Sequence, residues 1–244
     1  DMPRFFIQSG PEDGRLRIAG EDARHMVRVL RMKVGDEVTL CNSAGVDYSC
    51  VIEEAQPEQV ICRVLCEMPS SGEPTAFVTL YMALPKADKL EFVVQKAVEL
   101  GVSAIVPFVS ERCVSRPEEK SLRRKAERWR KIAAEAAKQC GRGRIPDVRD
   151  VVTYAQAVAE AGQAETALFF YECERETPLR GAIGGRMLTD VSLMIGPEGG
   201  FAPREAEQAQ AGGLTSVSLG KRILRCETAP LVALAAVMYE SGNL

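Results

Sequence analysis

The sequence predicts an α/β protein, with a mostly parallel sheet in its C-terminal part and a small β-barrel in its N-terminal part. Up to about residue 70, short β-like runs alternate with turn residues; beyond that point, apolar strands alternate with helices. We expect one domain over residues 1–71 and a second over 72–244, with the Pro-, Ser- and Gly-rich segment 68–75 as a linker. The 46% hydrophobic content of the 244 residues is enough to bury a core in each.

The N-terminal part contains five β-like runs and one helical insert. The runs read "RFFI", "RLRI", "EVTLCN", "YSCVIEEA" and "QVICRVL". In the insert "EDARHMVRVLRMKVGD", helical spacing predicts a basic face and an apolar face. The basic face carries Arg24, Arg28 and Arg31, and the apolar face carries Met26, Val27 and Leu30.

The C-terminal part contains five candidate strands, "AFVTLYMAL", "AIVPFVS", "TALFFYE", "VSLMIG" and "SVSLG". A helix over 87–100 has a clear apolar face and should stop at Gly101, where glycine permits a left-handed backbone. A second helix spans about 118–140 and ends at Gly141. The last helix, after Thr228, is apolar on nearly every side, which predicts burial in the fold or in a subunit interface.

Charge, cysteine usage and hydropathy favour a protein with an anion-binding surface and argue against a metal site and a membrane span. The net charge is −3, but residues 120–144 carry +8 and the remainder −11, which favours a local anion-binding surface over a merely solvated helix face. The eight cysteines include no CxxC pair, and His25 is the only histidine, so no metal site is expected and His25 is read as a surface or packing residue. No apolar run approaches the roughly 20 residues of a membrane span, and no export signal is visible, which favours a cytosolic protein with reduced thiols.

Ligands of a doubly wound sheet bind beyond the carboxyl ends of the strands, which directs attention to the turns "PKADK", "PEGGFAP" and "KRILRCETAP". No phosphate-binding glycine motif is present anywhere in the chain. The second turn contains Glu198 and no lysine, so it suits a ligand with hydrogen-bond donors or positive charge better than a pyrophosphate. The alternative is that Gly199 and Gly200 only permit positive φ before a helix that starts at Pro203.

The third turn brings basic residues, an acid and a predicted N-cap, Thr228, between a strand and the most apolar helix. The simpler interpretation of Arg222 and Arg225 is that they are exposed, flexible side chains.

Four segments in order, "ALPKADKLEFVVQKAVELGV", "QCGRGRIPDV", "IGPEGGFAPREAE" and "LGKRILRCETAPLVAL", resemble the bacterial 16S ribosomal RNA uridine-N3 methyltransferases. That family belongs to the SPOUT class of knotted RNA methyltransferases. The opening "MPRFFI" and "HMVRVLRMKVGD" resemble its N-terminal PUA-like domain, so the similarity covers essentially the whole chain.

The resemblance implies a C-terminal SPOUT domain with a trefoil knot, a homodimer in the cytoplasm, and S-adenosylmethionine as methyl donor. It also implies 16S rRNA as the partner, free or within the 30S subunit. The implied cofactor-binding residues are Leu84, Pro85, Ile195, Gly196, Pro197, Glu198, Gly199, Gly200, Leu219, Gly220, Ile223, Leu224, Thr228 and Ala229. One departure is Ala202, where relatives commonly place Ser or Thr, so that Glu205 should lack its partner in a capping box.

Methylation of uridine N3 requires loss of the imide proton and stabilisation of the negative charge that remains on the base. We assign the charge-stabilising role to Arg225, with Arg222 as second choice. We assign the role of proton acceptor to Glu198, with Glu227 as the alternative. Either acid could instead hold the ribose or the amino group of the cofactor. The candidate RNA-binding residues are Arg4, Arg24, Arg28, Arg31, Lys33, Lys86, Arg123, Arg124, Arg128, Arg142 and Arg144.

Three alternatives remain open at this point. A related SPOUT enzyme could act on another rRNA or tRNA position, because cofactor loops do not encode the acceptor atom. A non-catalytic RNA-binding assembly factor would use the same basic surfaces but would have no need for the crowded third turn. A Rossmann-type oxidoreductase ranks third, since its glycine motif is missing.

Overall fold

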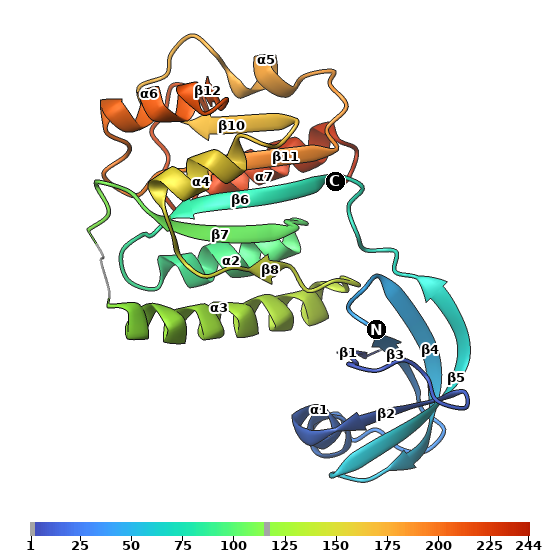
Figure 1. Ribbon diagram of the computed structural model, residues 1–244. Helices are drawn as coiled ribbons and strands as arrows, with labels where there is room; N and C mark the ends of the chain where they lie inside the picture. Colours follow the sequence, from blue (N-terminus) through green and yellow to red (C-terminus); the bar gives the residue numbers. More distant parts are fainter. Residues whose placement is uncertain (1–2, 115–117) are drawn as a thin grey trace. The chain divides into compact units, whose positions relative to one another are not determined.

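Figure 1 shows the computed structural model, which describes residues 3–114 and 118–244. The chain folds into two compact units: the first contains Asp1–Glu73 and Ala137–Ile145, and the second contains Pro74–Ala136 and Pro146–Leu244. No helix among the described residues is long and apolar enough to cross a membrane.

The first unit is built on a five-stranded sheet in the order β1-β3-β4-β5-β2, curled into a half-barrel (Figure 1). Strands β1 and β3 are parallel, and the other neighbours are antiparallel. The bounds are β1 (Arg4–Phe6), β2 (Arg15–Ala19), β3 (Glu37–Cys41), β4 (Val46–Ala55) and β5 (Gln59–Pro69). All five β-like runs of the sequence are therefore strands.

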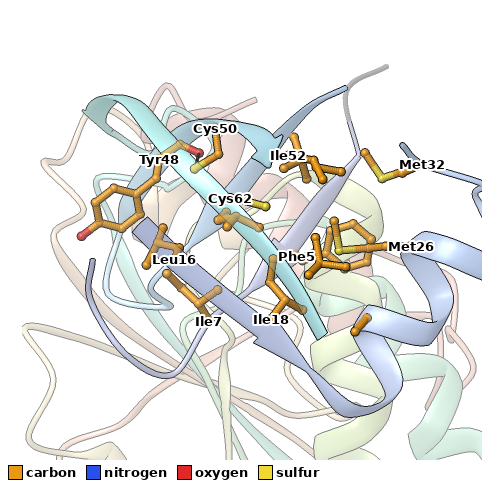
Figure 2. Packing of buried hydrophobic residues seen from close by; sticks show 14 residues of the cluster. Phe5, Ile7, Leu16, Ile18, Met26, Met32, Tyr48, Cys50, Ile52 and Cys62 are labelled. Carbon is orange, nitrogen blue, oxygen red and sulfur yellow. Dashed lines mark hydrogen bonds between the residues drawn. The ribbon is translucent and has the colours of Figure 1, made fainter. Parts of the chain in front are cut away.

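The core of this unit packs residues of the sheet against residues of the helical insert (Figure 2). Alternate residues of β2, Leu16 and Ile18, are 2% and 4% exposed, as expected for a strand with one buried face. Figure 2 shows them beside Phe5 of β1 and Cys62 of β5. Met26 of the helical insert packs into the same cluster and is fully buried.

The helical insert is shorter than the sequence predicts. It consists of α1 (Gly20–Arg24) and a π-helical turn, η1 (His25–Val29). Leu30, expected on the apolar face, is the C-cap residue and is 42% exposed. Arg31 has φ +56°, so the helix does not continue beyond Leu30. The chain instead turns so that the backbone N–H of Met32 donates to the Met26 carbonyl, which buries Met32 in the core.

The segment expected as a linker is ordered. Strand β5 runs to Pro69, because its last residues pair with β4. Beyond it, one carboxylate oxygen of Glu73 accepts hydrogen bonds from the backbone N–H groups of Gly143 and Arg144, at 2.8 and 2.9 Å. The same carboxylate forms an ion pair with Arg142 at 2.9 Å. These contacts fix residues 137–145 to the first unit, although this segment follows Glu73 by more than sixty positions in the sequence.

The second unit is an α/β structure around a parallel sheet in the order β12-β10-β11-β6-β7-β8, with β9 also pairing with β7. Both faces are covered by helices (Figure 1), which explains why the strands read as continuous apolar runs. The strands are β6 (Phe77–Ala83), β7 (Ala104–Val109), β8 (Asp147–Val148), β9 (Val152–Thr153), β10 (Thr166–Phe170), β11 (Asp190–Ile195) and β12 (Thr215–Val217). The five strands expected from the sequence are confirmed.

The helices of this unit are α2 (Lys89–Glu99), α3 (Glu119–Cys140), α4 (Tyr154–Ala161), α5 (Leu179–Ile183), α6 (Pro203–Ala211) and α7 (Ala229–Glu240). The end of α3, from Ala137, belongs to the first unit. α2 ends before Gly101, which has φ +95° as expected. α4 packs on β6, β7 and β11, while α7 packs on β6, β11 and α2. One face of α7 is buried, but Val232 and Tyr239 on its outer side are 41% and 74% exposed. Phe92 of α2 is 48% exposed.

Candidate active site

A cavity of about 450 Å³ opens beyond the carboxyl ends of β10, β11 and β12. Because these strands are parallel and adjacent, the turns that follow them meet at one edge of the sheet. The walls are Phe170 to Glu172, the glycine turn 196–200, residues 217–220, and the third turn from Arg222 to Cys226. Sequence positions some fifty residues apart therefore share one site.

The glycine turn is held by two side chains that sequence reasoning missed: Glu172, which lines the cavity, and Arg112, which does not. Glu172 accepts a hydrogen bond from the backbone N–H of Phe201 at 3.1 Å. Arg112 donates to the Gly199 carbonyl at 3.1 Å. Gly200 has φ +66°, and a Cβ there would lie 1.8 Å from a carboxylate oxygen of Glu172. The positive φ favours glycine at 200, and any side chain there would also have to displace the Glu172 carboxylate.

The helix after this turn starts at Pro203, as expected, and its cap differs from the prediction. Glu205 is only 3% exposed, and its carboxylate accepts from the backbone N–H groups of Ala202 at 2.9 Å and of Glu111 at 2.8 Å. Ala202 removes one half of a capping box, but Glu205 keeps the other half. Its second oxygen finds a partner in the loop after β7, so the glutamate ties two turns together.

Lys89 connects the three turns singled out in the sequence. Its Nζ lies 3.1 Å from Oε1 of Glu198 and 3.1 Å from Oε2 of Glu227. The backbone N–H of Lys86 also donates to Glu198 at 3.1 Å, and the thiol of Cys226 donates to Glu227 at 3.1 Å. The first, second and third turns each contribute to this cluster.

The cluster sets the protonation of both acids. Burial raises the pKa of Glu198, but hydrogen bonds from backbone N–H groups and from Lys89 outweigh it, so the net pKa is lowered. The hydrogen bond from Cys226, with that from Lys89, lowers the pKa of Glu227. Burial raises the pKa of the Cys226 thiol to about 12, which keeps it protonated as a donor. Both carboxylates are therefore ionised at neutral pH and are weaker proton acceptors than unpaired carboxylates.

Arg222 and Arg225 both line the cavity, as does Glu198. The two arginines are exposed, and within the described residues neither guanidinium has an ion pair or hydrogen bond. The carbonyl of Arg225 accepts from the backbone N–H groups of Thr228 and Ala229, at 2.9 and 3.0 Å, which forms the turn that leads into α7. The backbone of Arg225 is fixed while its charge remains available.

Most of the implied cofactor-binding residues line this cavity, and three do not. Leu84 and Pro85 follow β6 and are buried, and they are absent from the cavity wall. Thr228 is exposed outside the wall and occupies the N-cap position of α7, but its side chain makes no capping hydrogen bond. The implied residues that line the wall are Ile195, Gly196, Pro197, Glu198, Gly199, Gly200, Leu219, Gly220, Ile223, Leu224 and Ala229.

The candidate RNA-binding residues divide into held and exposed groups. Arg4 forms an ion pair with Asp47, and its side chain is 13% exposed. Arg142 is 4% exposed and is paired with Glu73. Phosphate contact by either would first require breaking a partly buried ion pair, which argues against it. The exposed members are Arg24, Arg28, Arg31, Lys33, Lys86, Arg123, Arg124, Arg128 and Arg144, of which Arg128 also pairs with Glu91 at 2.7 Å.

Sequence reasoning missed Lys89 as a member of the site, although it lies in the "PKADK" turn already selected by its position after a strand. It also missed Arg175, which lines the cavity and whose guanidinium donates to the Glu172 carbonyl at 2.7 Å. Glu172 closes the expected strand "TALFFYE", where its place at the carboxyl end was the available signal.

Comparison with known proteins gives a consistent assignment. The model of an RNA methyltransferase domain matches residues 72–238, and that of an RNA methyltransferase PUA domain matches residues 18–65. A protein of Bacillus subtilis named ribosomal RNA small subunit methyltransferase E is 36% identical, over all of this chain and 98% of the relative. Its namesake from Mycobacterium tuberculosis is 32% identical, over 96% of this chain and 90% of the relative.

A solved structure supports the same assignment. The ribosomal RNA small subunit methyltransferase E of Neisseria gonorrhoeae, crystallised with S-adenosyl methionine, is 30% identical with a TM-score of 0.87, and 98% of each chain is covered. Matches of this extent include both units of the fold. The chain therefore belongs to the RNA methyltransferase family whose members are named ribosomal RNA small subunit methyltransferase E.

Proposed function

We propose that this protein transfers a methyl group from S-adenosylmethionine to N3 of a uridine in small-subunit ribosomal RNA. One observation carries the proposal: the same cavity is lined by a glycine turn that bears an ionised carboxylate and by two arginines that have no partner among the described residues. The carboxylate suits a cationic donor, and the arginines suit the negative charge of a deprotonated base and its RNA. The relatives' name, ribosomal RNA small subunit methyltransferase E, and the S-adenosyl methionine bound to one of them support the same methyl donor and an rRNA acceptor.

The residues present fit such a cofactor. A cavity of about 450 Å³ lies within the range of roughly 300 to 1,000 Å³ that small-molecule sites occupy. Ile195, Leu219 and Leu224 offer apolar wall for an adenine ring, and Glu198 offers negative charge for a cation. The cofactor, when bound, supplies an electrophilic methyl group on a sulfonium. A diphosphate would gain little here, because the glycine turn presents an acid and no lysine.

Within this reaction, Arg225 stabilises negative charge on the uridine oxygens, with Arg222 as second choice. Glu198 remains the first candidate for the proton and Glu227 the second, but their shared contact with Lys89 lowers the driving force for proton uptake. The carboxylate of Glu198 also suits the positive charge of the cofactor. Arg225 promotes transfer of the N3 proton to Glu198, or to Glu227 as the alternative, by stabilising the anion that remains on the base.

Calorimetric titration with S-adenosylmethionine, S-adenosylhomocysteine and NADH tests this proposal. We expect the two adenosyl compounds to bind and NADH not to bind. Mapping the methylated nucleotide in rRNA then identifies the acceptor atom. If neither adenosyl compound binds, the result would favour the alternative of a non-catalytic RNA-binding assembly factor. Methylation at another position would favour a related RNA methyltransferase.

We further propose that the target base is turned out of its RNA helix and that exposed arginines hold the backbone. Replacing Arg24 and Arg28 with glutamate should weaken RNA binding. The slope of the logarithm of the binding constant against the logarithm of the salt concentration should become shallower by about 0.7 to 0.9 for each phosphate contact that is lost. Fluorescence titration at several salt concentrations measures this slope. The matched control replaces Arg17 and Arg63, which carry the same charge in the same unit; an equal effect there would contradict a specific contact.

We propose that the protein acts as a homodimer in the cytoplasm. This is supported by exposed apolar side chains on the two contacting helices α2 and α7, namely Phe92, Val232 and Tyr239, because a large exposed apolar surface marks an interaction site. Val232→Glu places a charge on this surface and should shift the mass measured by light scattering from dimer to monomer. Val34→Glu, at an exposed valine in the first unit, should leave the dimer intact.

A further inference from the structure

Lys89 is the first residue of α2, and its ammonium group lies between two carboxylates that come from different turns. Both distances are 3.1 Å, to Glu198 of the glycine turn and to Glu227 of the third turn. The three side chains are 22% to 32% exposed, so solvent screens their charges only in part. One cation against two anions leaves this cluster with a net charge of −1.

The cluster is placed behind one wall of the cavity. Glu198 and Cys226 line that wall, whereas Lys89 and Glu227 do not. Lys89 and Glu227 therefore influence a ligand in the cavity through the position of Glu198 and through electrostatic potential. Backbone N–H groups hold Glu198 independently of Lys89, so its carboxylate keeps a partner when the lysine is replaced.

We propose that Lys89 is a positioning residue that helps the backbone to hold Glu198 at the cavity wall and cancels one of the two carboxylate charges of the cluster, which sets how strongly the cavity prefers the methyl donor over its spent product. This inference rests on S-adenosylmethionine being the cofactor. The donor carries a sulfonium and the product a neutral thioether, because the sulfur keeps the electron pair of the broken bond to the methyl carbon. The charge of −1 on the cluster favours the donor, and Lys89 limits that preference so that the donor is not held too tightly.

The test is the ratio of the dissociation constants of S-adenosylhomocysteine and S-adenosylmethionine, measured by calorimetry without RNA. Lys89→Met adds one net negative charge and should raise the preference for the cationic donor about threefold to tenfold, as expected for one charge in a partly screened site. Glu227→Gln removes one negative charge and should shift the ratio by a similar factor in the opposite direction. The double variant restores −1 and should return the ratio close to that of the unmodified protein.

Two further variants separate charge from general effects. Lys89→Arg keeps the cation and should keep the ratio. Lys96→Met removes the same charge from the same helix, where Lys96 pairs with Glu99, and should also leave the ratio unchanged. If the role of Lys89 were purely structural, Lys89→Met would weaken the binding of both ligands equally. The ratio of their dissociation constants would then stay unchanged.

The results distinguish the inference from the proposed function. If the unmodified protein binds neither adenosyl compound, the proposed function fails. If it binds both but Lys89→Met and Lys96→Met give the same ratio, the inference alone is overturned. Should Lys89→Met not fold, as judged by its thermal transition, Glu227→Gln alone decides: a shift towards the neutral product supports the inference, and an unchanged ratio overturns it.

Discussion

Replacing Arg225 with alanine is expected to slow methyl transfer at least about 100-fold, the scale for a lost charge-stabilising donor, while S-adenosylmethionine still binds. The physical reason is that its guanidinium faces the cavity with no partner among the described residues, so its charge is free to act on the substrate. Single-turnover transfer of a labelled methyl group to rRNA, at saturating cofactor, measures the chemical step.

Lys221→Ala is the matched control for this variant. Lys221 lies in the same turn, is exposed and does not line the cavity, so its removal should alter transfer by less than about tenfold, through long-range charge alone. Turnover close to normal in Arg225→Ala would contradict the assigned role. A large loss in Arg222→Ala alone would move that role to Arg222.

Gly200→Ala is expected to have the largest effect on cofactor binding. The left-handed backbone at φ +66° costs about 1 to 2 kcal/mol for a residue with a Cβ. The new Cβ also displaces the Glu172 carboxylate, and losing its bond to the Phe201 N–H costs about 1 to 3 kcal/mol more. If half of this summed free-energy cost must be met on binding the cofactor, the affinity for S-adenosylmethionine drops about tenfold, because each 1.4 kcal/mol of binding free energy corresponds to a factor of ten in the dissociation constant.

Gly199→Ala provides the comparison, because it adds the same methyl group one residue earlier. Gly199 lacks positive φ, and its Cβ would lie 3.1 Å from the Arg112 Cβ, so a small shift suffices. Calorimetry should show an affinity within about threefold of the unmodified protein, since the strain is well below one kcal/mol. Equal losses in both variants would show that the turn is sensitive to any side chain and not to the conformation at Gly200.

The sequence predicts the longer strands of both units and misses the shortest ones, for a physical reason. Strands such as β6 and β11 are buried on both faces and read as unbroken apolar runs, whereas β8 and β9 have two residues each and give no periodic signal. The end of β5 reads as a linker because Pro and Ser favour turns, but pairing with β4 overrides that preference.

The candidate site could be predicted only as far as the order of turns allows. Parallel strands bring their carboxyl ends together, so the glycine turn and Arg225 could be placed at one edge. The ion pairs of Lys89, and the bonds that Glu205 makes to two turns, depend on side-chain packing between segments far apart in the chain. Local spacing carries no information about such contacts.

The attachment of residues 137–145 to the first unit has a consequence for exchanging parts between relatives. Glu73 holds the backbone of Gly143 and Arg144, and the buried thiol of Cys41 donates to the Gly143 carbonyl at 3.0 Å. A chimera that grafts only the N-terminal residues onto another enzyme would leave the Glu73 carboxylate and the Cys41 thiol without these partners. The transferable module is therefore discontinuous: N-terminal residues and the 137–145 segment have to be inherited together.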